Sequence, residues 1–155
     1  MAQGPYQGRP NQNRREEAPY QQEDSGWLSN IRFAAPAPEL FNTIAKNAAQ
    51  RVARADPNRN KPSQLRRFYD ELLLWETRVS QQPLNEQAAK FTEYLPFIRM
   101  LNAKAAYAEG RKLVDSNFIK LLQHTLSEVE SPQTLTTCKY FWEAFMGFYK
   151  QERQD

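Results

Sequence analysis

The chain has 155 residues, 40% hydrophobic and 25% charged, and its 21 Lys and Arg against 18 Asp and Glu give a net charge of +3. These values are typical of one soluble globular domain. A single cysteine excludes an intramolecular disulfide and a thiolate zinc site, and a single histidine excludes a two-histidine metal site. No apolar run is long enough to cross a bilayer and the sequence opens with no secretion signal, so we expect a soluble, cytoplasmic protein with no membrane partner.

The N-terminal segment has the composition of a disordered tail. Gln, Asn, Pro and Gly supply half of the first 26 residues, and the only apolar side chains there longer than alanine are one methionine and two tyrosines. Such a stretch cannot bury enough apolar surface to offset the entropy lost on ordering. We therefore predict a disordered tail over residues 1–34 and a helical domain over residues 35–155. The alternative is a peptide that folds on binding, centred on Trp27, Leu28 and Ile31.

From Pro36 onward the sequence predicts helices joined by short connections. Apolar residues recur at intervals of three and four, which is the periodicity of an amphipathic helix. Proline is favoured in a first helical turn, so the first helix is predicted to open near Pro36 or Pro38. The predicted helical stretches cover residues 39–55, 63–80, 84–110, 116–130 and 133–153.

Several residues mark the predicted helix ends. Ser63 is expected to cap the second helix, and Pro96 is expected to break the third stretch at Tyr94 and Leu95. Gly110 is expected to end that stretch as the glycine just beyond a helix. The predicted fold class is all-α, a compact bundle of five or six helices.

Basic charge is concentrated in two windows of the chain. Residues 46–67 carry seven cations and one acid, and residues 99–112 carry four cations and one acid. Cations interspersed with neutral donors such as Asn58, Asn60, Ser63 and Gln64 are typical of a surface that binds a phosphate backbone.

The alternative interpretation of the first window is a solvated helix end, where cations complement the helix dipole. It explains Arg51 and Arg54, but acids rather than Arg66 and Arg67 are expected just after an N-cap.

The second helix also carries apolar surface opposite its core stripe. On a helical projection Leu74 lies beside Arg67 and Arg78, with Leu73 on the flank. A single exposed leucine is ordinary. We nevertheless identify Leu74 and Arg78 as the candidate edge of a protein–protein contact.

Side chains capable of catalysis are scarce. His124 is interpreted as a solvated surface histidine, and Cys138 as a small buried apolar residue. No phosphate-binding glycine loop occurs, and the carboxylates of Asp70, Glu71 and Glu76 do not converge. The prediction is that the chain is not an enzyme and has no metal site or cofactor. A ribonuclease is disfavoured for want of a second histidine.

Three segments stand out when read in chain order. They are Ser63–Asp70 (SQLRRFYD), Lys104–Arg111 (KAAYAEGR) and the aromatic run over residues 140–150 (YFWEAF…FYK). In this order and spacing they resemble the small subunit of type III-A CRISPR effector complexes, the Csm small subunit. The resemblance covers about residues 40–152, and the Gln-rich tail has no counterpart in it.

The resemblance implies a non-catalytic helical subunit that stacks in several copies and contacts the backbone of the guide RNA–target RNA duplex, in defence against foreign nucleic acid. The implied partners are guide RNA, target RNA, other effector subunits and copies of itself. By position, it places Ser63, Gln64, Arg66, Arg67 and Arg111 near RNA.

Charge pattern and resemblance together give one predicted RNA-binding set. It comprises Arg51, Arg54, Arg59, Lys61, Ser63, Gln64, Arg66, Arg67, Lys104, Arg111 and Lys112. Two alternatives remain for single residues: Arg66 pairs with Asp70 four residues on, and Arg111 binds the last carbonyls of its own helix. For the whole chain, the alternative is a helical adaptor that binds only proteins, whose affinity would respond little to salt.

Overall fold

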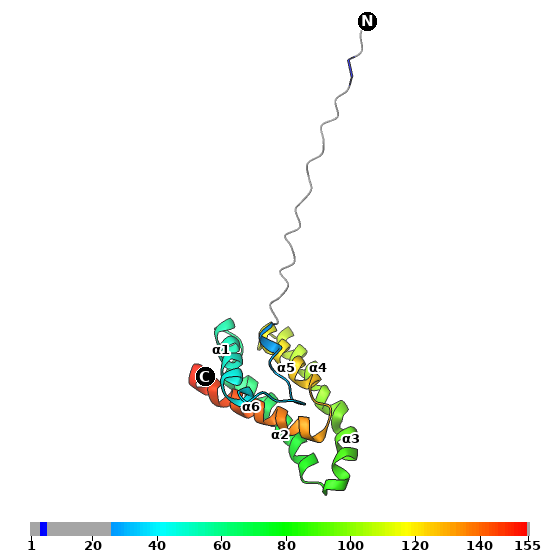
Figure 1. The fold of residues 1–155 in the computed structure, drawn as a ribbon. Coiled ribbons are helices and arrows are strands. Elements are labelled where there is room, and N and C mark those ends of the chain that lie inside the picture. The colour runs from blue at the N-terminus through cyan, green and yellow to red at the C-terminus, as the bar shows by residue number, and fades with distance from the viewer. Residues whose placement is uncertain (1–3, 6–25, 155) are drawn as a thin grey trace.

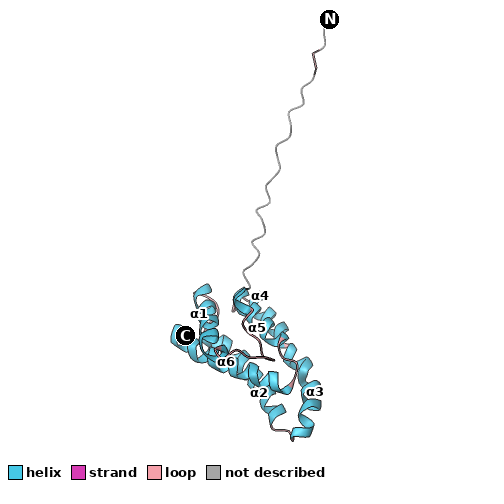
Figure 2. Cartoon of the chain, in the orientation of Figure 1, coloured by secondary structure: helices cyan, strands magenta, loops and turns pink. Residues whose placement is uncertain are grey.

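The computed structural model describes residues 4–5 and 26–154, and its folded part is helical (Figure 1, Figure 2). A 3-10 turn, η1 (Gly26–Leu28), and a π-helical turn, η2 (Leu40–Ile44), precede the first α-helix, and a 3-10 turn, η3 (Leu84–Glu86), follows the second. The α-helices are α1 (Ala45–Ala55), α2 (Pro62–Ser80), α3 (Gln87–Arg99), α4 (Leu101–Gly110), α5 (Ser116–Ser127) and α6 (Pro132–Glu152). No strand occurs among the described residues, so the predicted all-α bundle is confirmed.

The C-terminal helix α6 is the centre of the packing. It lies against α1 and α2, and its carboxyl end lies beside α1 in Figure 1. The helix α3 packs on α2, and α4 packs on α5. The buried residues of α6 recur every three or four positions, as expected for a helix with one apolar face. They include Leu135, Cys138, Phe141, Trp142, Phe145 and Tyr149.

Aromatic rings link α6 to its neighbours. The ring of Trp142 lies 4.8 Å from that of Phe145 and 6.0 Å from that of Phe118 on α5. The buried indole also donates a hydrogen bond of 3.1 Å to the hydroxyl of Thr125. The core therefore combines edge-to-face ring packing with a satisfied polar group, which is the arrangement that stabilises a buried tryptophan.

The start of α2 differs from the sequence prediction, and the start of α5 has a cap that the sequence analysis did not name. Lys61, not Ser63, is the N-cap of α2, because Pro62 occupies the first helical turn and Ser63 already lies inside the helix. In α5 the N-cap is Asp115, whose carboxylate accepts the backbone N–H groups of Asn117 and Phe118. Acceptors of this kind satisfy amides that have no partner within the helix.

The predicted break at Tyr94 and Leu95 is wrong. The helix α3 continues through Pro96 to Arg99, and the chain changes helix at Met100. Trp75 of α2 explains why: its ring lies 5.3 Å from that of Tyr94 and 5.5 Å from that of Phe97. Residues three apart share a face only when the turn between them is helical, so this packing holds the helix around the proline.

The last part of the predicted tail packs on the helical bundle. Within residues 26–34, the side chains of Leu28, Ile31 and Phe33 are buried in the core. A short apolar run inside a polar segment is enough for this, because helices elsewhere in the chain provide its binding surface. The rest of the predicted tail, residues 1–3 and 6–25, lies outside the described residues.

His124 fastens this N-terminal strap, defined as residues 26–34. Its Nε2 lies 2.7 Å from the carbonyl oxygen of Ile31, and the carboxylate of Glu128 accepts the N–H of Phe33 at 3.4 Å. The side chain is half-buried, so the prediction of a solvated surface histidine is wrong. The helical projection correctly places His124 away from the apolar face of α5. The strap, however, covers this other face of the helix.

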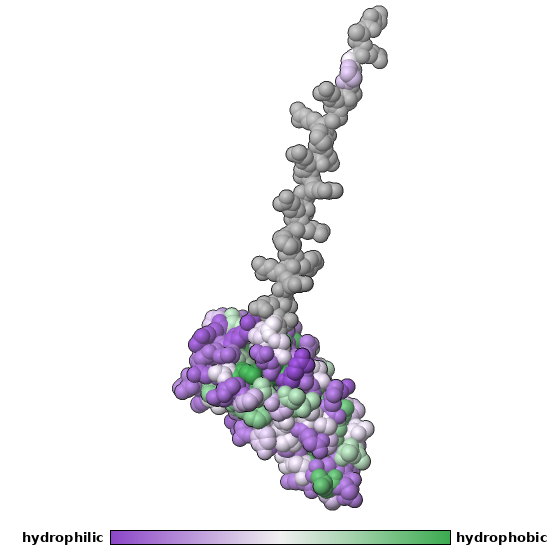
Figure 3. All heavy atoms as spheres, in the orientation of Figure 1, coloured by the Kyte–Doolittle hydropathy of each residue, from purple (hydrophilic) through white to green (hydrophobic). Residues whose placement is uncertain are grey.

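The surface is mostly polar on the face shown in Figure 3, with apolar residues gathered in small patches. One patch lies at the end of the α2–α3 hairpin, where Leu84 is 83% exposed. No helix in the described ranges is long and apolar enough to span a membrane.

Candidate nucleic-acid interface

One groove brings the two basic windows together. One wall is a face of α2, with Gln64, Arg67, Phe68 and Glu71. The other is a face of α4 and its C-cap residue, with Lys104, Tyr107, Ala108 and Arg111. Both faces follow the same spacing of three, four and seven residues, which places four side chains in a row along one side of a helix. The groove encloses about 230 Å³ and is also lined by Leu113.

The groove carries more positive than negative charge. The Lys104 ammonium lies 2.5 Å from the carboxylate of Glu71, an ion pair that joins the two walls. Arg67 is exposed and pairs with no carboxylate of the described chain, and the Arg111 guanidinium lies 5.9 Å from the centroid of the Tyr107 ring. Two guanidinium groups therefore remain free of acidic partners at this site, within the part of the chain that the structure describes.

The end of α4 sets the direction of Arg111 and Lys112. Lys112 has a φ of 60°. Its backbone N–H donates to the carbonyl of Glu109 at 2.9 Å, and the backbone N–H of Leu113 donates to the carbonyl of Ala108 at 2.9 Å. These two bonds form a Schellman cap with Lys112 in the left-handed position. The prediction that Gly110 fills that position is wrong: Gly110 is the last helical residue and has no positive φ.

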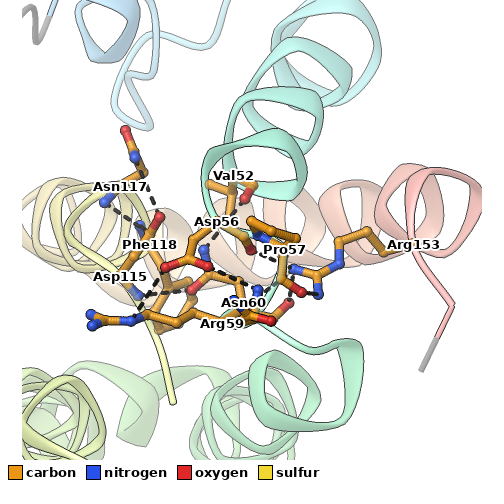
Figure 4. A network of polar contacts seen from close by, with 10 residues as sticks. Val52, Asp56, Pro57, Arg59, Asn60, Asp115, Asn117, Phe118 and Arg153 are labelled. Carbon is orange, nitrogen blue, oxygen red and sulfur yellow. Dashed lines mark hydrogen bonds and ion pairs between the residues drawn. The ribbon is translucent and has the colours of Figure 1, made fainter. Parts of the chain in front are cut away.

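The α1–α2 loop is tied to this end of the groove by Asn60 (Figure 4). Its amide nitrogen donates to the carbonyl of Val52 at 3.3 Å, and its side-chain oxygen accepts the N–H of Asp115 at 2.9 Å. Its backbone N–H donates to the carbonyl of Leu113 at 2.9 Å. Asn60 is fully buried, so its predicted role as a donor to phosphate is wrong: the side chain holds the two connections together.

Arg153 closes the same loop from the end of α6 (Figure 4). Its guanidinium donates to the carbonyls of Asp56 at 3.3 Å, Pro57 at 3.1 Å and Asn60 at 3.3 Å, and also to that of Arg59. The side chain of Arg59 pairs with Asp56 at 3.4 Å. A loop whose carbonyls are held in this way presents its exposed residue Lys61 from a fixed backbone.

The remaining predicted RNA residues lie outside the groove. On α1, Arg54 pairs with Glu152 at 3.4 Å, and the Arg51 guanidinium lies 4.9 Å from the centroid of the Trp27 ring. These two arginines line a separate hollow of about 480 Å³. The cations of the first window therefore do not form one surface: Arg67 lines the groove, while Arg51, Arg54 and Arg66 line other hollows.

Arg66 pairs with Asp70 at 3.0 Å, which is the alternative that the i, i+4 spacing allowed. The hydrogen bond that the Arg66 guanidinium donates to the Asp70 carboxylate raises the pKa of Arg66. With Ser63, Arg66 lines a third hollow beside Met146 and Lys150. The alternative interpretation of Arg111 is not observed, because its guanidinium lies over the Tyr107 ring.

Leu74 and Arg78 occupy an exposed aromatic edge. Leu74 is 45% exposed, and the Arg78 guanidinium lies 4.9 Å from the centroid of the Trp75 ring. That indole is also stacked on Phe97, with a plane angle of 16°. The structure thus adds Phe97, which the sequence pattern did not single out, to the surface around the predicted contact.

Tyr107 is the groove residue that sequence reasoning missed. It is 68% exposed and stands between cations of both windows. The signal was present, because residues 104, 107, 108 and 111 repeat the spacing of residues 64, 67, 68 and 71. No group of three or more potential metal ligands occurs in residues 26–154.

Comparison with known proteins places the chain in a family. The family model described as Csm2 Type III-A matches residues 35–155. Comparisons with curated proteins and with solved structures give no match. The matched region contains all six α-helices and both walls of the groove, and leaves out the strap. The chain therefore belongs to the Csm2 type III-A family, the small subunits of the type III-A Csm complex.

Proposed function

We propose that the chain binds the phosphate backbone of paired guide and target RNA through the α2–α4 groove, as a non-catalytic subunit present in several stacked copies. Family membership gives the coarser statement, a structural subunit of a type III-A CRISPR effector that associates with other effector subunits. The observation that carries the RNA contact is the meeting of Arg67 and Arg111 in one groove, with no carboxylate partner for either in the described chain.

Guanidinium groups suit this role for a physical reason. A planar guanidinium donates two parallel hydrogen bonds to a phosphate, and it is weakly hydrated, so little solvation is lost on binding. Phosphate contacts read no sequence, which fits a subunit of an effector whose specificity comes from base pairing. Lys61, Gln64 and Lys112 extend the same surface as further donors.

The other predicted cations contribute less in this proposal. Arg54, Arg59 and Arg66 each pair with a carboxylate of the chain. Each would bind phosphate only by exchanging one anion for another, so its removal should change RNA affinity less than removal of Arg67 or Arg111. Lys104 is intermediate, because it shares its charge with Glu71.

The test is binding of target RNA by the reconstituted effector at several salt concentrations. Replacing both Arg67 and Arg111 by Gln should weaken binding of all RNA sequences alike. It should also flatten the slope of log K against log salt by about 0.7–0.9 for each phosphate that is no longer neutralised. The matched control replaces Arg54 and Arg66 by Gln, which removes the same number of charges from outside the groove.

The edge at Leu74 and Arg78 is proposed as a contact with another protein subunit. Leu74 and Phe97 are 45% and 48% exposed, an amount of apolar surface that a neighbour would cover favourably. Arg78→Ala should weaken assembly and leave the salt slope of RNA binding unchanged.

If the variant with both Arg67 and Arg111 replaced by Gln binds RNA with unaltered affinity and salt slope, the chain is instead an adaptor that binds only proteins.

A further inference from the structure

We propose that the α2–α4 groove is also a binding site for one unpaired nucleobase, which stacks on Tyr107 while Arg67 and Arg111 hold the flanking phosphates. This inference rests on the proposed function, because it assumes that RNA occupies the groove. The proposed function involves only the phosphate backbone of the RNA. The further inference adds the flat, uncharged face of a base as a second ligand.

The exposure of Tyr107 is the first observation. It is 68% exposed, whereas Phe68 in the same groove is half-buried and Phe118 in the core is fully buried. The Arg111 guanidinium lies over the ring at 5.9 Å, so a cation already occupies a position near one face. The remaining exposed ring surface is available to a second planar group.

The composition of the groove is the second observation. Its lining includes the apolar side chains of Phe68, Ala108 and Leu113 as well as the charged ones. A phosphate gains nothing from such a lining, but a base with an apolar face does. Gln64 lies on the α2 wall, as Phe68 does, and its side-chain amide supplies both a donor and an acceptor, which can pair with the polar edge of any base.

The combination favours a nucleotide over a peptide. Three cations lie in the groove, and its one carboxylate, that of Glu71, is taken up by Lys104 at 2.5 Å. An aromatic ring interleaved with cations is the arrangement with which proteins bind single-stranded nucleic acid. Bases inside a duplex are already stacked on their neighbours, so the base that reaches Tyr107 must be unpaired or turned out of the helix.

The experiment uses the full-length chain and two short single-stranded RNAs, an oligouridylate and the same backbone with its central bases removed. Tyr107→Ala should lower affinity for the base-bearing RNA about 5-fold or more, the range measured for single stacked bases. It should leave affinity for the abasic RNA unchanged, and Tyr107→Phe should retain wild-type binding. A 2-aminopurine at the central position should lose fluorescence on binding to wild type but not to Tyr107→Ala.

The matched control is Tyr140→Ala. Tyr140 is also an exposed tyrosine, 46% exposed, with a cation over its ring, the Lys139 ammonium at 4.3 Å, but it does not line this groove. Removal of the Tyr140 ring should change the affinity for neither the base-bearing nor the abasic RNA.

Each other result overturns the inference. If Tyr107→Ala lowers binding of both RNAs equally, the ring only positions Arg111. If Tyr107→Ala binds normally while the double arginine variant has a flattened salt slope, backbone binding stands and base stacking fails. If neither variant changes binding, the proposed function fails together with this inference.

Discussion

The hydroxyl of Tyr149 on the last helix donates a hydrogen bond of 2.5 Å to the backbone carbonyl of Asn60 in the α1–α2 loop. Both residues are fully buried, and the bond joins segments 89 residues apart. The backbone N–H of Asn60 also donates to the carbonyl of Leu113. One asparagine therefore connects α6, the start of α2 and the segment that follows α4. The position of one groove wall relative to the other therefore depends on it.

Asn60→Ala should lower the free energy of unfolding by about 2–4 kcal/mol. The change removes two side-chain hydrogen bonds from a buried site and leaves the amide of Asp115 without its acceptor. Alanine also fits the φ of 59° poorly. Urea denaturation gives the value, with Asn58→Ala on the exposed side of the loop as the control. Equal stability of the two variants would contradict the role assigned to Asn60.

Gly110→Ala should raise the free energy of unfolding by about 0.5–1 kcal/mol. Gly110 lies inside α4 without a positive φ, and a Cβ atom there would meet no atom within 4 Å, so the change only removes the entropy cost of a helical glycine. The sequence-based prediction, which places Gly110 beyond the helix end, requires a loss instead. Lys112→Gly should also stabilise, because Lys112 has the left-handed conformation. Thermal unfolding of both variants shows whether Gly110 lies inside α4 or beyond its end.

His124→Ala should loosen the N-terminal strap. Removing the hydrogen bond with the Ile31 carbonyl lowers stability by about 1 kcal/mol and exposes the strap backbone. Arg32, which lies in the strap and is exposed, should then be cut by trypsin faster than in wild type. Gln123→Ala, an exposed neighbour on the same helix, is the control and should be cut at the wild-type rate. No change in cleavage at Arg32 would show that the apolar residues alone hold the strap.

Cys138 should not react with thiol reagents in the folded protein. The side chain is fully buried, and burial raises the pKa of its thiol above the value of an exposed cysteine. The unfolded chain therefore releases this proton first, so the contribution of Cys138 to stability is complete below about pH 8.5 and falls as the pH rises above it. Cys138→Ala should cost about 1 kcal/mol or less near neutral pH, and its stability should fall less than that of wild type at alkaline pH.

Two measurements check the behaviour of Cys138: denaturation curves at several pH values, and labelling with Ellman's reagent with and without denaturant. Labelling of the native protein would mean that α6 opens locally. A constant difference between Cys138→Ala and wild type at all pH values would contradict the raised pKa.

Local sequence patterns were enough to predict the fold class and most helices. The periodicity of apolar residues located α2, α5 and α6 to within a few residues, because a helix is held by bonds between near neighbours and its apolar face repeats locally. Composition also located the cations, since charge is a property of the residue. Neither prediction required knowledge of which segments meet in space.

Everything that depends on contacts between distant residues came from the packing of the chain. Periodicity shows which face of a helix is apolar, but not which partner covers the opposite side, so the strap over His124 and the helix through Pro96 were both missed. The same limit applies to the groove. The matching rows on α2 and α4 were present in the sequence, but contacts between distant residues place them face to face, among them the Glu71–Lys104 ion pair and the Asn60–Leu113 hydrogen bond. Arg67 and Arg111 are 44 positions apart in the chain, and their shared groove follows from packing that no local pattern records.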